Sequence, residues 1–274
     1  MKLAVTTLAP DVTVNVPVAL LAGDFADRLA RAAQLGYDGV ELMVVRPERL
    51  DPAAIRALAA ELGLEIAAVA SGALGLAERL TLLAADDATE RLAAERLREL
   101  IVLAAQLDAP IVTIGSFRGR LAWTGGTIGR TRLVAALRRA AEQAAEYGVR
   151  LALEPLNRYE TDIVNNVNEG LALIDEVEHS RLGLLLDTFH ANIEEPSLYD
   201  CFRQASAAGR LWHVHLGDSN RLPPGQGHVD FAGIVEALRA SGYQGNLSAE
   251  LLALPDPDTA AIATIEYMRH LIPK

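Results

Sequence analysis

Eight short apolar runs alternate along the chain with longer segments that have the 3.6-residue period of amphipathic helices. Strands that alternate with helices predict parallel pairing, since a parallel pair needs a long crossover connection. Eight such strands predict closure into a single (β/α)8 barrel, an α/β fold in which every strand ends at the same face. The eight runs are KLAVTTL, GVELMV, EIAAVAS, PIVTIGS, RLALEPL, LGLLLDT, WHVHLG and NLSAELL.

Helix boundaries in the sequence agree with a barrel. The pair Asp51-Pro52 opens a helical segment, and glycines follow others at positions 36, 63, 148 and 242. An open doubly wound sheet is the alternative, and it would need a glycine-rich phosphate-binding turn after the first strand. Residues 8–11 read Leu-Ala-Pro-Asp, which is not such a turn. We therefore expect one barrel domain over residues 1–274.

Composition limits the classes of partner. The chain has 25 Lys and Arg against 36 Asp and Glu, and this net charge of −11 argues against nucleic acid and an anionic membrane surface as partners. Cys201 is the single cysteine, so we expect no disulfide framework and a cytoplasmic location. The segment MKLAVTTLAP predicts a first strand rather than a signal peptide, and no apolar run of about 18 residues predicts a membrane span.

Three carboxylates and one imidazole stand at the ends of four of the runs: Glu154, Asp187, His215 and Glu250. They are 33, 28 and 35 positions apart, about the length of one strand–helix unit. A barrel would bring them to one face, where the carboxylates repel one another unless a cation lies between them. The sequence therefore predicts one divalent metal ion. Oxygen ligands with one imidazole favour Mn²⁺, with Mg²⁺, Co²⁺ or Zn²⁺ as alternatives.

The two-residue period of a strand divides each run into an inward and an outward face. Residues two positions before each expected ligand share its inward direction; they are Ala152, Leu185, His213 and Ser248. The residues between are expected to face the helices; they are Leu153, Leu186, Val214 and Ala249. Both histidines of the seventh run thus point inward. We expect His215, nearer the mouth, to be the ligand and His213 to lie one layer deeper.

The loops after the fifth, sixth and seventh runs carry further polar residues. Glu160 lies in the segment EPLNRYE, His190 in DTFHANIEE and Arg221 in GDSNRLPPGQG. Polar residues crowded just beyond a strand end are typical of a functional loop, so we expect His190 to lie over the barrel opening and Arg221 to be able to hold a substrate oxygen. A salt-bridged turn and a structural histidine are the plainer alternatives.

Several strings together resemble a known family. LEPLNRYETD, LLLDTFHANIEE, HVHLGDSNRLPPGQG and SAELL are similar to the sugar isomerase/epimerase family of xylose-isomerase-like barrels, within it to the D-tagatose/D-psicose 3-epimerase branch, and most closely to the 5-keto-L-gluconate epimerase type. The resemblance implies the four metal ligands named above, Glu154 and Glu250 as proton-transfer carboxylates, and substrate contacts by Glu160, His190 and Arg221. The last strand reads Ala-Glu-Leu-Leu where relatives have Glu-Pro or Glu-Cys, which leaves the ligand in place.

These residue types fit an isomerase that inverts the carbon next to the ketone of a keto sugar or keto-sugar acid. One carboxylate on each side of that carbon removes and returns a proton, and a metal neutralises the developing enolate. The alternatives are an aldose–ketose isomerase, such as hydroxypyruvate isomerase, and a neutral ketose 3-epimerase. A three-zinc DNA endonuclease would need more histidines and a basic groove. A non-catalytic binding protein would be expected to lack Glu154 or Glu250.

Two arginines follow the fourth run in the string SFRGR, and the resembling keto-gluconate epimerases carry a similar Arg-Gly-Arg. Because a carboxylate is a good partner for a guanidinium, we expect Arg118, the nearer to the strand, to bind a substrate carboxylate. Pairing of Arg118 and Arg120 with acidic neighbours is the alternative. The roles of Glu41, His213 and His228 stay open, as do the substrate, the metal and assembly into a homo-oligomer.

Overall fold

The computed structural model describes the whole chain, residues 1–274, and its eight strands form one closed parallel barrel. Each strand pairs with the next in sequence and β1 pairs with β8, so the expected α/β fold with a (β/α)8 barrel is confirmed. Each expected run contains one strand. The strands are β1 Lys2–Leu8, β2 Gly39–Met43, β3 Glu65–Ala70, β4 Ile111–Ile114, β5 Arg150–Leu153, β6 Leu182–Asp187, β7 Leu211–Leu216 and β8 Asn246–Ala249.

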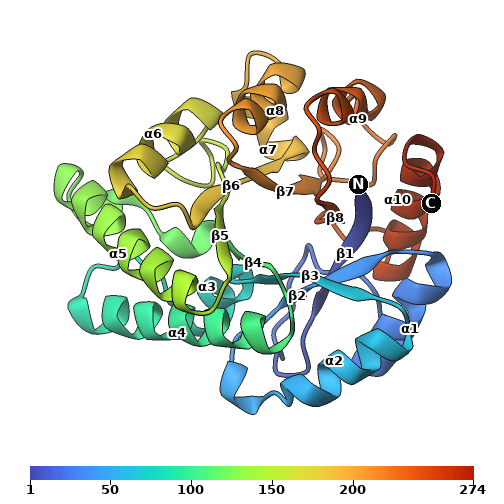
Figure 1. Ribbon diagram of the computed structural model, residues 1–274, viewed down its shortest axis with the longest axis horizontal. Coiled ribbons are helices and arrows are strands. Elements are labelled where there is room, and N and C mark those ends of the chain that lie inside the picture. Colours follow the sequence, from blue (N-terminus) through green and yellow to red (C-terminus); the bar gives the residue numbers. More distant parts are fainter.

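Helices surround the barrel as an outer ring (Figure 1). Acidic side chains start several of them: Asp24, Asp51 and Asp86 each accept a backbone N–H of the first turn, which compensates donors that the helix itself leaves free. The helices are α1 Phe25–Leu35, α2 Pro52–Glu61, α3 Gly72–Glu78, α4 Asp87–Gln106, α5 Thr127–Glu146, α6 Val167–Val177, α7 Thr188–Glu194, α8 Leu198–Ala207, α9 Phe231–Ala240 and α10 Pro257–Leu271. Three 3-10 turns are η1 Pro47–Arg49, η2 Ser116–Arg118 and η3 Leu121–Trp123.

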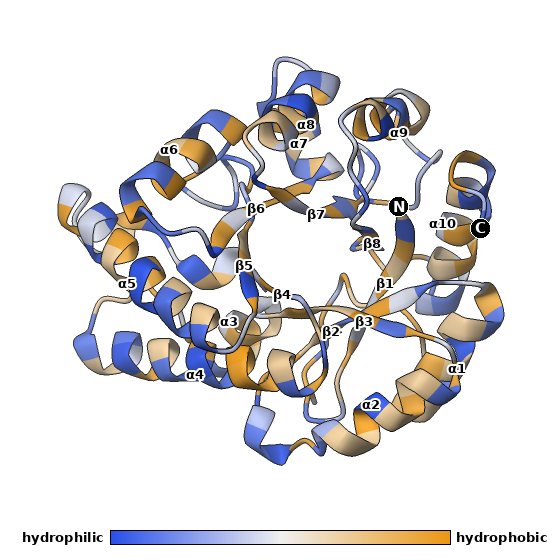
Figure 2. Ribbon diagram, viewed as in Figure 1, coloured by the Kyte–Doolittle hydropathy of each residue, from blue (hydrophilic) through white to orange (hydrophobic).

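The hydrophobic core lies between the strands and the helices. A single cluster of 75 buried apolar residues runs round the barrel, which identifies one continuous core rather than several. Figure 2 shows the helices with apolar residues on one side and polar residues on the other, as this packing requires. The outward strand residues Leu153, Leu186, Val214 and Ala249 all belong to the cluster, as expected.

The interior of the barrel is a mixture of small apolar and polar side chains. Ala152 and Leu185 lie in a separate small cluster of four buried residues, while His213 and Ser248 are fully buried polar residues. Glu41 is also fully buried, and it pairs in register with Ala68 of β3. The polar interior is concentrated toward the carboxyl ends of the strands, which we call the mouth; the opposite end is the floor.

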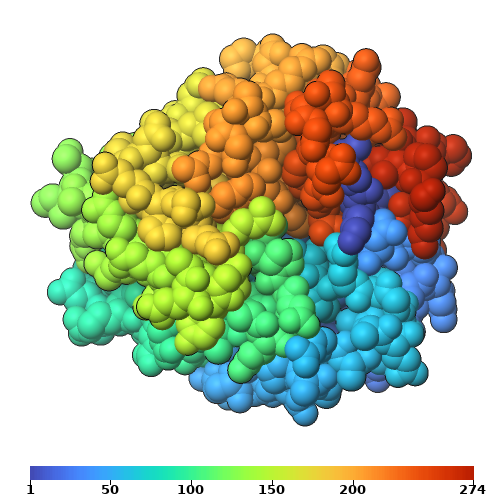
Figure 3. Space-filling model, in the orientation of Figure 1, coloured from blue at the N-terminus to red at the C-terminus, as the bar shows by residue number.

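The two ends of the chain meet beside β1. Figure 3 shows the first residues next to the red C-terminal segments in the space-filling view. The Tyr37 hydroxyl donates to the carbonyl of Ala261 at 2.7 Å, and Arg269 bonds Asp38 at 2.8 Å, so α10 is fixed against the β1–β2 region. No helix of the chain is long and apolar enough to cross a membrane.

Candidate metal centre and active site

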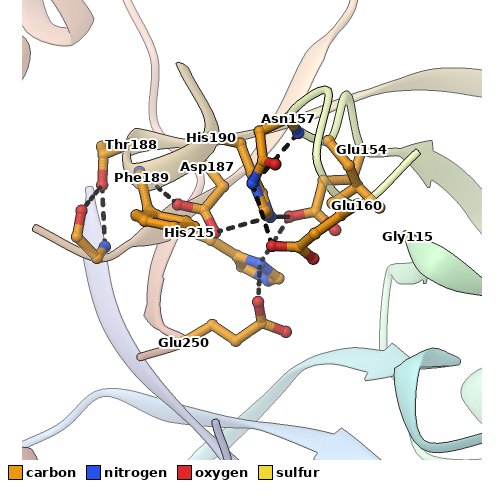
Figure 4. A network of polar contacts seen from close by, with 12 residues as sticks. Gly115, Glu154, Asn157, Glu160, Asp187, Thr188, Phe189, His190, His215 and Glu250 are labelled. Carbon is orange, nitrogen blue, oxygen red and sulfur yellow. Dashed lines mark hydrogen bonds and ion pairs between the residues drawn. The ribbon is translucent and has the colours of Figure 1, made fainter. Parts of the chain in front are cut away.

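The four expected ligands lie together at the mouth. Glu154 directly follows β5, Asp187 ends β6, His215 lies in β7 and Glu250 directly follows β8. One ligand atom from each lies within 4.8 Å of the others, and all four residues are buried. Figure 4 shows their polar ends directed toward one another. Parallel strands produce this convergence because all eight deliver their carboxyl ends to the same face.

Three buried polar atoms of this cluster have no hydrogen-bond partner: Glu154 Oε1, Asp187 Oδ2 and His215 Nδ1. Buried polar atoms are nearly always paired, so three unpaired ones this close together are suited to hold a cation. An octahedral ion with ligand bonds of about 2.1 Å separates its ligand atoms by about 3.0–4.2 Å. His215 Nδ1 lies 3.6 Å from Glu154 Oε1 and 3.5 Å from Glu250 Oε2, which fits such an ion.

Burial and mutual repulsion shift the acid groups of the cluster. Burial raises the pKa of Asp187 to about 7, and repulsion from Glu154 adds to the effect. Burial also raises the pKa of Glu154, although attraction to His215 opposes the shift. Burial opposes the charge of Glu250 too, but His215 and Arg221 outweigh it and lower its pKa to about 2. A divalent cation among these groups would favour the ionised form of all three carboxylates.

Glu41 holds the imidazole of His215 from below. Glu41 Oε2 lies 2.8 Å from His213 Nε2 and 3.1 Å from His215 Nε2, inside the barrel. Burial opposes the charge of Glu41, but the two histidines lower its pKa well below the usual value, so it is an ionised acceptor. His215 therefore donates through Nε2 and directs Nδ1 at the cluster, the carboxylate–histidine arrangement common behind metal ligands. Glu41 is thus a partner of the two histidines, and His213 lies one layer deeper as expected.

His190 is held as a neutral donor by Asn157. The Asn157 amide is oriented by two contacts: Oδ1 accepts from the Tyr159 N–H at 3.0 Å, and Nδ2 donates to Glu160 at 3.1 Å. Nδ2 also lies 2.8 Å from His190 Nδ1, so that ring nitrogen must accept and Nε2 carries the proton. Burial and repulsion from Arg221 lower the pKa of His190 to about 3, which keeps the ring neutral. Its Nε2 faces Glu154 and lies 3.9 Å from it.

Arg221 spans the cavity entrance between two carboxylates. Its guanidinium lies 3.2 Å from Glu160 and 3.3 Å from Glu250, and packs 5.0 Å above the Phe189 ring. The buried Asp218 shapes the loop that presents it by accepting the backbone N–H groups of residues 219, 225 and 229. Glu160 and Arg221 therefore lie where the sequence predicted, beside the metal cluster.

A cavity of about 400 Å³ opens over the cluster. Glu154, His215 and Glu250 form its polar end, and Glu160 and Arg221 lie on its wall. Apolar residues complete the lining, among them Val16, Val18, Met43, Leu156 and Leu252. Gly115 is required at this place, because a Cβ there would lie 2.5 Å from an oxygen of Glu154. An apolar cavity with a few convergent polar groups is the usual form of a small-molecule site.

The expectation for Arg118 is wrong. Its side chain is fully buried, and the guanidinium donates to the main-chain carbonyls of Gly115, Glu154, Ile163 and Val164 at 2.6–3.2 Å. These contacts leave no free edge for a substrate carboxylate. Arg118 instead stabilises the loop after β5 through these hydrogen bonds, and so fixes the position of the main chain at Glu154. The acidic-neighbour alternative is also not observed for Arg118, since its partners are carbonyls.

Arg120 and His228 lie outside this cavity. Arg120 is partly exposed and donates to the carbonyl of Tyr159 at 3.3 Å. His228 is exposed, and its backbone N–H donates to the Ser219 hydroxyl at 3.1 Å. Neither residue contacts the metal cluster.

Comparison with known proteins bears on this arrangement. Residues 29–271 match the family model described as "Xylose isomerase-like TIM barrel". The chain belongs to this family. It is 34% identical over 246 residues to the L-ribulose 3-epimerase of Methylomonas sp. (strain DH-1), covering 89% of this chain and 84% of that protein. It is 35% identical over 226 residues to the L-ribulose 3-epimerase of Mesorhizobium japonicum, covering 81% and 73%.

The fold of this chain is also similar to the solved structure of an epimerase. The crystal structure of a D-allulose 3-epimerase from Methylomonas sp. superposes with a TM-score of 0.79 at 28% identity, covering 98% of both chains. Within the family, this chain belongs to the D-tagatose/D-psicose 3-epimerase branch, as the sequence motifs indicated. The prediction of an enzyme of the isomerase class is confirmed.

Sequence reasoning did not assign two residues that shape the site. Asn157 lies in the polar string EPLNRYE, but no spacing rule indicates that its amide sets the tautomer of His190. Asp218 lies next to two glycine-rich turns, and an aspartate before a Gly/Pro-rich loop is a turn signal that could have been used. Asn157 contacts His190, which only folding brings near, whereas the contacts of Asp218 lie within its own loop.

Proposed function

We propose that this protein is a divalent-metal-dependent epimerase that inverts the carbon next to the ketone of a keto sugar. The observation that supports it best is the buried set of Glu154, Asp187, His215 and Glu250, three of whose polar atoms lack any partner, beneath a cavity of about 400 Å³. Two of the three carboxylates in this set, Glu154 and Glu250, can also exchange protons with a bound ligand. The relatives that bear the name of 3-epimerases support the same class.

In this proposal Glu154 and Glu250 are the acid/base pair. They come from β5 and β8, three strands apart around the barrel, and the imidazole of His215 lies between them. One carboxylate removes the proton from the substrate carbon, and the other returns a proton to its opposite side, which inverts it. A bound divalent cation would stabilise negative charge that develops on the substrate oxygen. His190 donates through Nε2 toward this site, and Arg221 orients Glu250 and the substrate hydroxyls.

The geometry favours a neutral keto sugar over a keto-sugar acid. We call the cavity over the four ligands the inner cavity. Arg221 is its one lining arginine or lysine, and Glu160 and Glu250 already pair with it. Arg118, the residue expected to bind a carboxylate, is buried against main-chain carbonyls. A substrate carboxylate in the inner cavity would thus face mainly acidic neighbours, which costs free energy. We propose Mn²⁺ as the metal on the oxygen-rich ligand set, and the cytoplasm as the compartment.

The test is a panel of ketoses and keto-sugar acids incubated with the Mn²⁺-loaded protein in D2O. Deuterium incorporated at C3 of a ketose, together with the epimeric product, is the expected outcome. Exchange between C1 and C2 would identify an aldose–ketose isomerase instead. Retention of the original hydrogen after turnover would contradict proton exchange through solvent-accessible carboxylates.

A further inference from the structure

A second hollow adjoins the cavity over the metal cluster. Its volume is about 690 Å³, and it shares with the inner cavity the lining residues Gly72, Leu76, Ser116 and Glu160. The two hollows are therefore adjacent, with these four residues at the boundary between them. We call the second part the outer groove; it lies between α3, the start of α4 and the loop after β4.

The outer groove is larger than the proposed substrate requires. Small-molecule sites of about 300–1,000 Å³ enclose ligands well above the size of one sugar, so the inner cavity of about 400 Å³ alone has room for a six-carbon keto sugar. A carboxylate or a hydroxymethyl group would fill little of the additional 690 Å³. The space is sufficient for a second ring.

Two exposed large apolar side chains line the outer groove. Trp123, at the end of η3, is 50% exposed, and Leu76 of α3 is 59% exposed. Large apolar side chains exposed together beside a cavity indicate a contact surface for a ligand. The flat indole face suits the C–H face of a sugar ring, because both are apolar and flat while the ring hydroxyls point outward to polar partners.

The remaining lining supplies hydrogen-bond donors. Arg79 and Arg120 form no ion pair with any carboxylate. The side chain of Arg120 donates one hydrogen bond, to the carbonyl of Tyr159. The acidic residues nearby are engaged: Asp86 accepts from Thr89 at the start of α4, and Glu160 pairs with Arg221. The outer groove therefore offers guanidinium N–H groups to a ligand that brings oxygen atoms.

We propose that the outer groove is a subsite for a second sugar ring, joined by a glycosidic bond to the end of the keto sugar that lies away from the ketone. Trp123 stacks against that ring, and Arg79 and Arg120 donate to its hydroxyls. The proposal rests on the proposed function, since the keto sugar in the inner cavity positions the attached ring. The substrate class is thus a ketose-containing glycoside.

Two matched sugars test this subsite: fructose and isomaltulose. Isomaltulose is fructose with a glucosyl unit on the hydroxyl at the end of the chain away from the ketone. We expect the Mn²⁺-loaded protein to have the higher kcat/KM for isomaltulose, measured by deuterium incorporation. Trp123→Ala should lower the ratio of the two kcat/KM values about tenfold. Tyr147→Ala, which removes an aromatic side chain exposed outside the groove, should leave the ratio unchanged. An unchanged ratio in Trp123→Ala would overturn the proposal.

An anionic occupant is the competing outcome. If fructose 6-phosphate has a higher kcat/KM than isomaltulose, and Arg120→Gln removes that preference, the outer groove binds an anionic group and the second-ring assignment is wrong. The same Arg120→Gln variant should lower the isomaltulose ratio only about threefold, since it removes donors to a neutral ring.

Binding separates failure of the subsite from failure of the proposed function. Absence of deuterium exchange with every ketose would refute the epimerase. In that case, calorimetric titration of the Glu154→Gln protein with the two sugars still decides the subsite. We expect isomaltulose to bind about tenfold more tightly than fructose, and Trp123→Ala to remove the difference. Equal affinities of the Glu154→Gln protein for the two sugars would overturn the proposal.

Discussion

The two ends of the barrel use the same eight strands but differ in how their charged groups are paired. At the floor, Lys2 pairs with Glu65 in a partly exposed contact, and Asn246 donates to the other oxygen of Glu65 at 2.7 Å. The guanidinium of Arg150 lies 5.2 Å above the Trp212 ring. The charged groups of the floor thus have partners within the protein or in solvent, and the amide oxygen of Asn246 is the buried atom left unpaired there.

At the mouth, the charged groups are buried and incompletely paired. Asp187 and His215 each leave one buried atom without a partner, and burial raises the pKa of Asp187 to about 7. Such an arrangement lowers the stability of the metal-free protein, because buried charge without compensation costs free energy. The difference teaches that the fold is stable through its core and floor, while the mouth holds the buried charged groups of the proposed metal site.

Glutamine substitutions should show the largest difference between the two ends. Glu154→Gln or Glu250→Gln keeps an oxygen ligand but removes the base, so turnover and deuterium incorporation should fall about 10²-fold or more. The floor control, Glu65→Gln, loses only a partly exposed ion pair and should stay within about twofold of the unmodified protein. Either mouth variant retaining more than about a tenth of the rate would remove that carboxylate from the acid/base pair.

The contact between Glu41 and His215 predicts that two buried positions inside the barrel differ in their effect on metal affinity. Glu41→Gln should weaken Mn²⁺ binding about 10–100-fold, because the ring of His215 loses its ionised acceptor. Calorimetric titration of metal-stripped protein measures the affinity. Thr6→Ala is the control from the same interior, where the Thr6 hydroxyl contacts Ser248 at 3.2 Å and not the histidines. Equal affinities of Glu41→Gln and Thr6→Ala would show that Glu41 does not orient the ligand.

Metal addition should stabilise the mouth, and through it the whole chain. Mn²⁺ at 100 times its Kd adds about 2.7 kcal/mol to the free energy of unfolding, which raises Tm by about 5–10 °C. Asp187→Asn should lose most of this increase, while Glu65→Gln at the floor should keep it. Scanning calorimetry with and without chelator measures both. A metal-dependent rise in Tm that survives in Asp187→Asn would place the ion elsewhere.

The smallest expected effect is the pH dependence of the metal-free protein. The pKa of Asp187 is about 7 in the folded chain and near 3.8 in the unfolded chain, so unfolding releases its proton between these values and stability falls as pH rises from about 4 to 7. Metal-free Asp187→Asn should therefore exceed the unmodified protein in Tm at pH 8, by about 3 °C or more, and by less at pH 5.

Asp256→Asn is the control of opposite sign for this pH effect. Asp256 accepts the Thr259 N–H at the start of α10, which lowers its pKa, so its charge stabilises the folded chain above its unfolded pKa. Its replacement should lower Tm at both pH values. If metal-free Asp187→Asn also has a lower Tm than the unmodified protein at pH 8, burial of the Asp187 charge does not destabilise the folded chain.

The barrel and the cluster at its mouth follow from sequence because both depend on local periodicity. Alternation of apolar runs with helical segments determines eight parallel strands, and a two-residue period determines which side chains point inward. The ends of parallel strands must share a face, so Glu154, Asp187, His215 and Glu250 converge whatever the details of the loops. Resemblance to the epimerase branch rests on long motifs that surround these same positions.

Tertiary structure alone decided the contacts of Arg118 and Glu41. The two-residue period stops with the strand, so the sequence could not show that Arg118 turns away from the mouth to bind four main-chain carbonyls. Glu41 and the two histidines of β7 are more than 170 positions apart, and only barrel closure brings them within hydrogen-bonding distance. Strand positions are set by short-range pattern, whereas loop side chains are set by whichever distant polar groups the closed barrel places next to them.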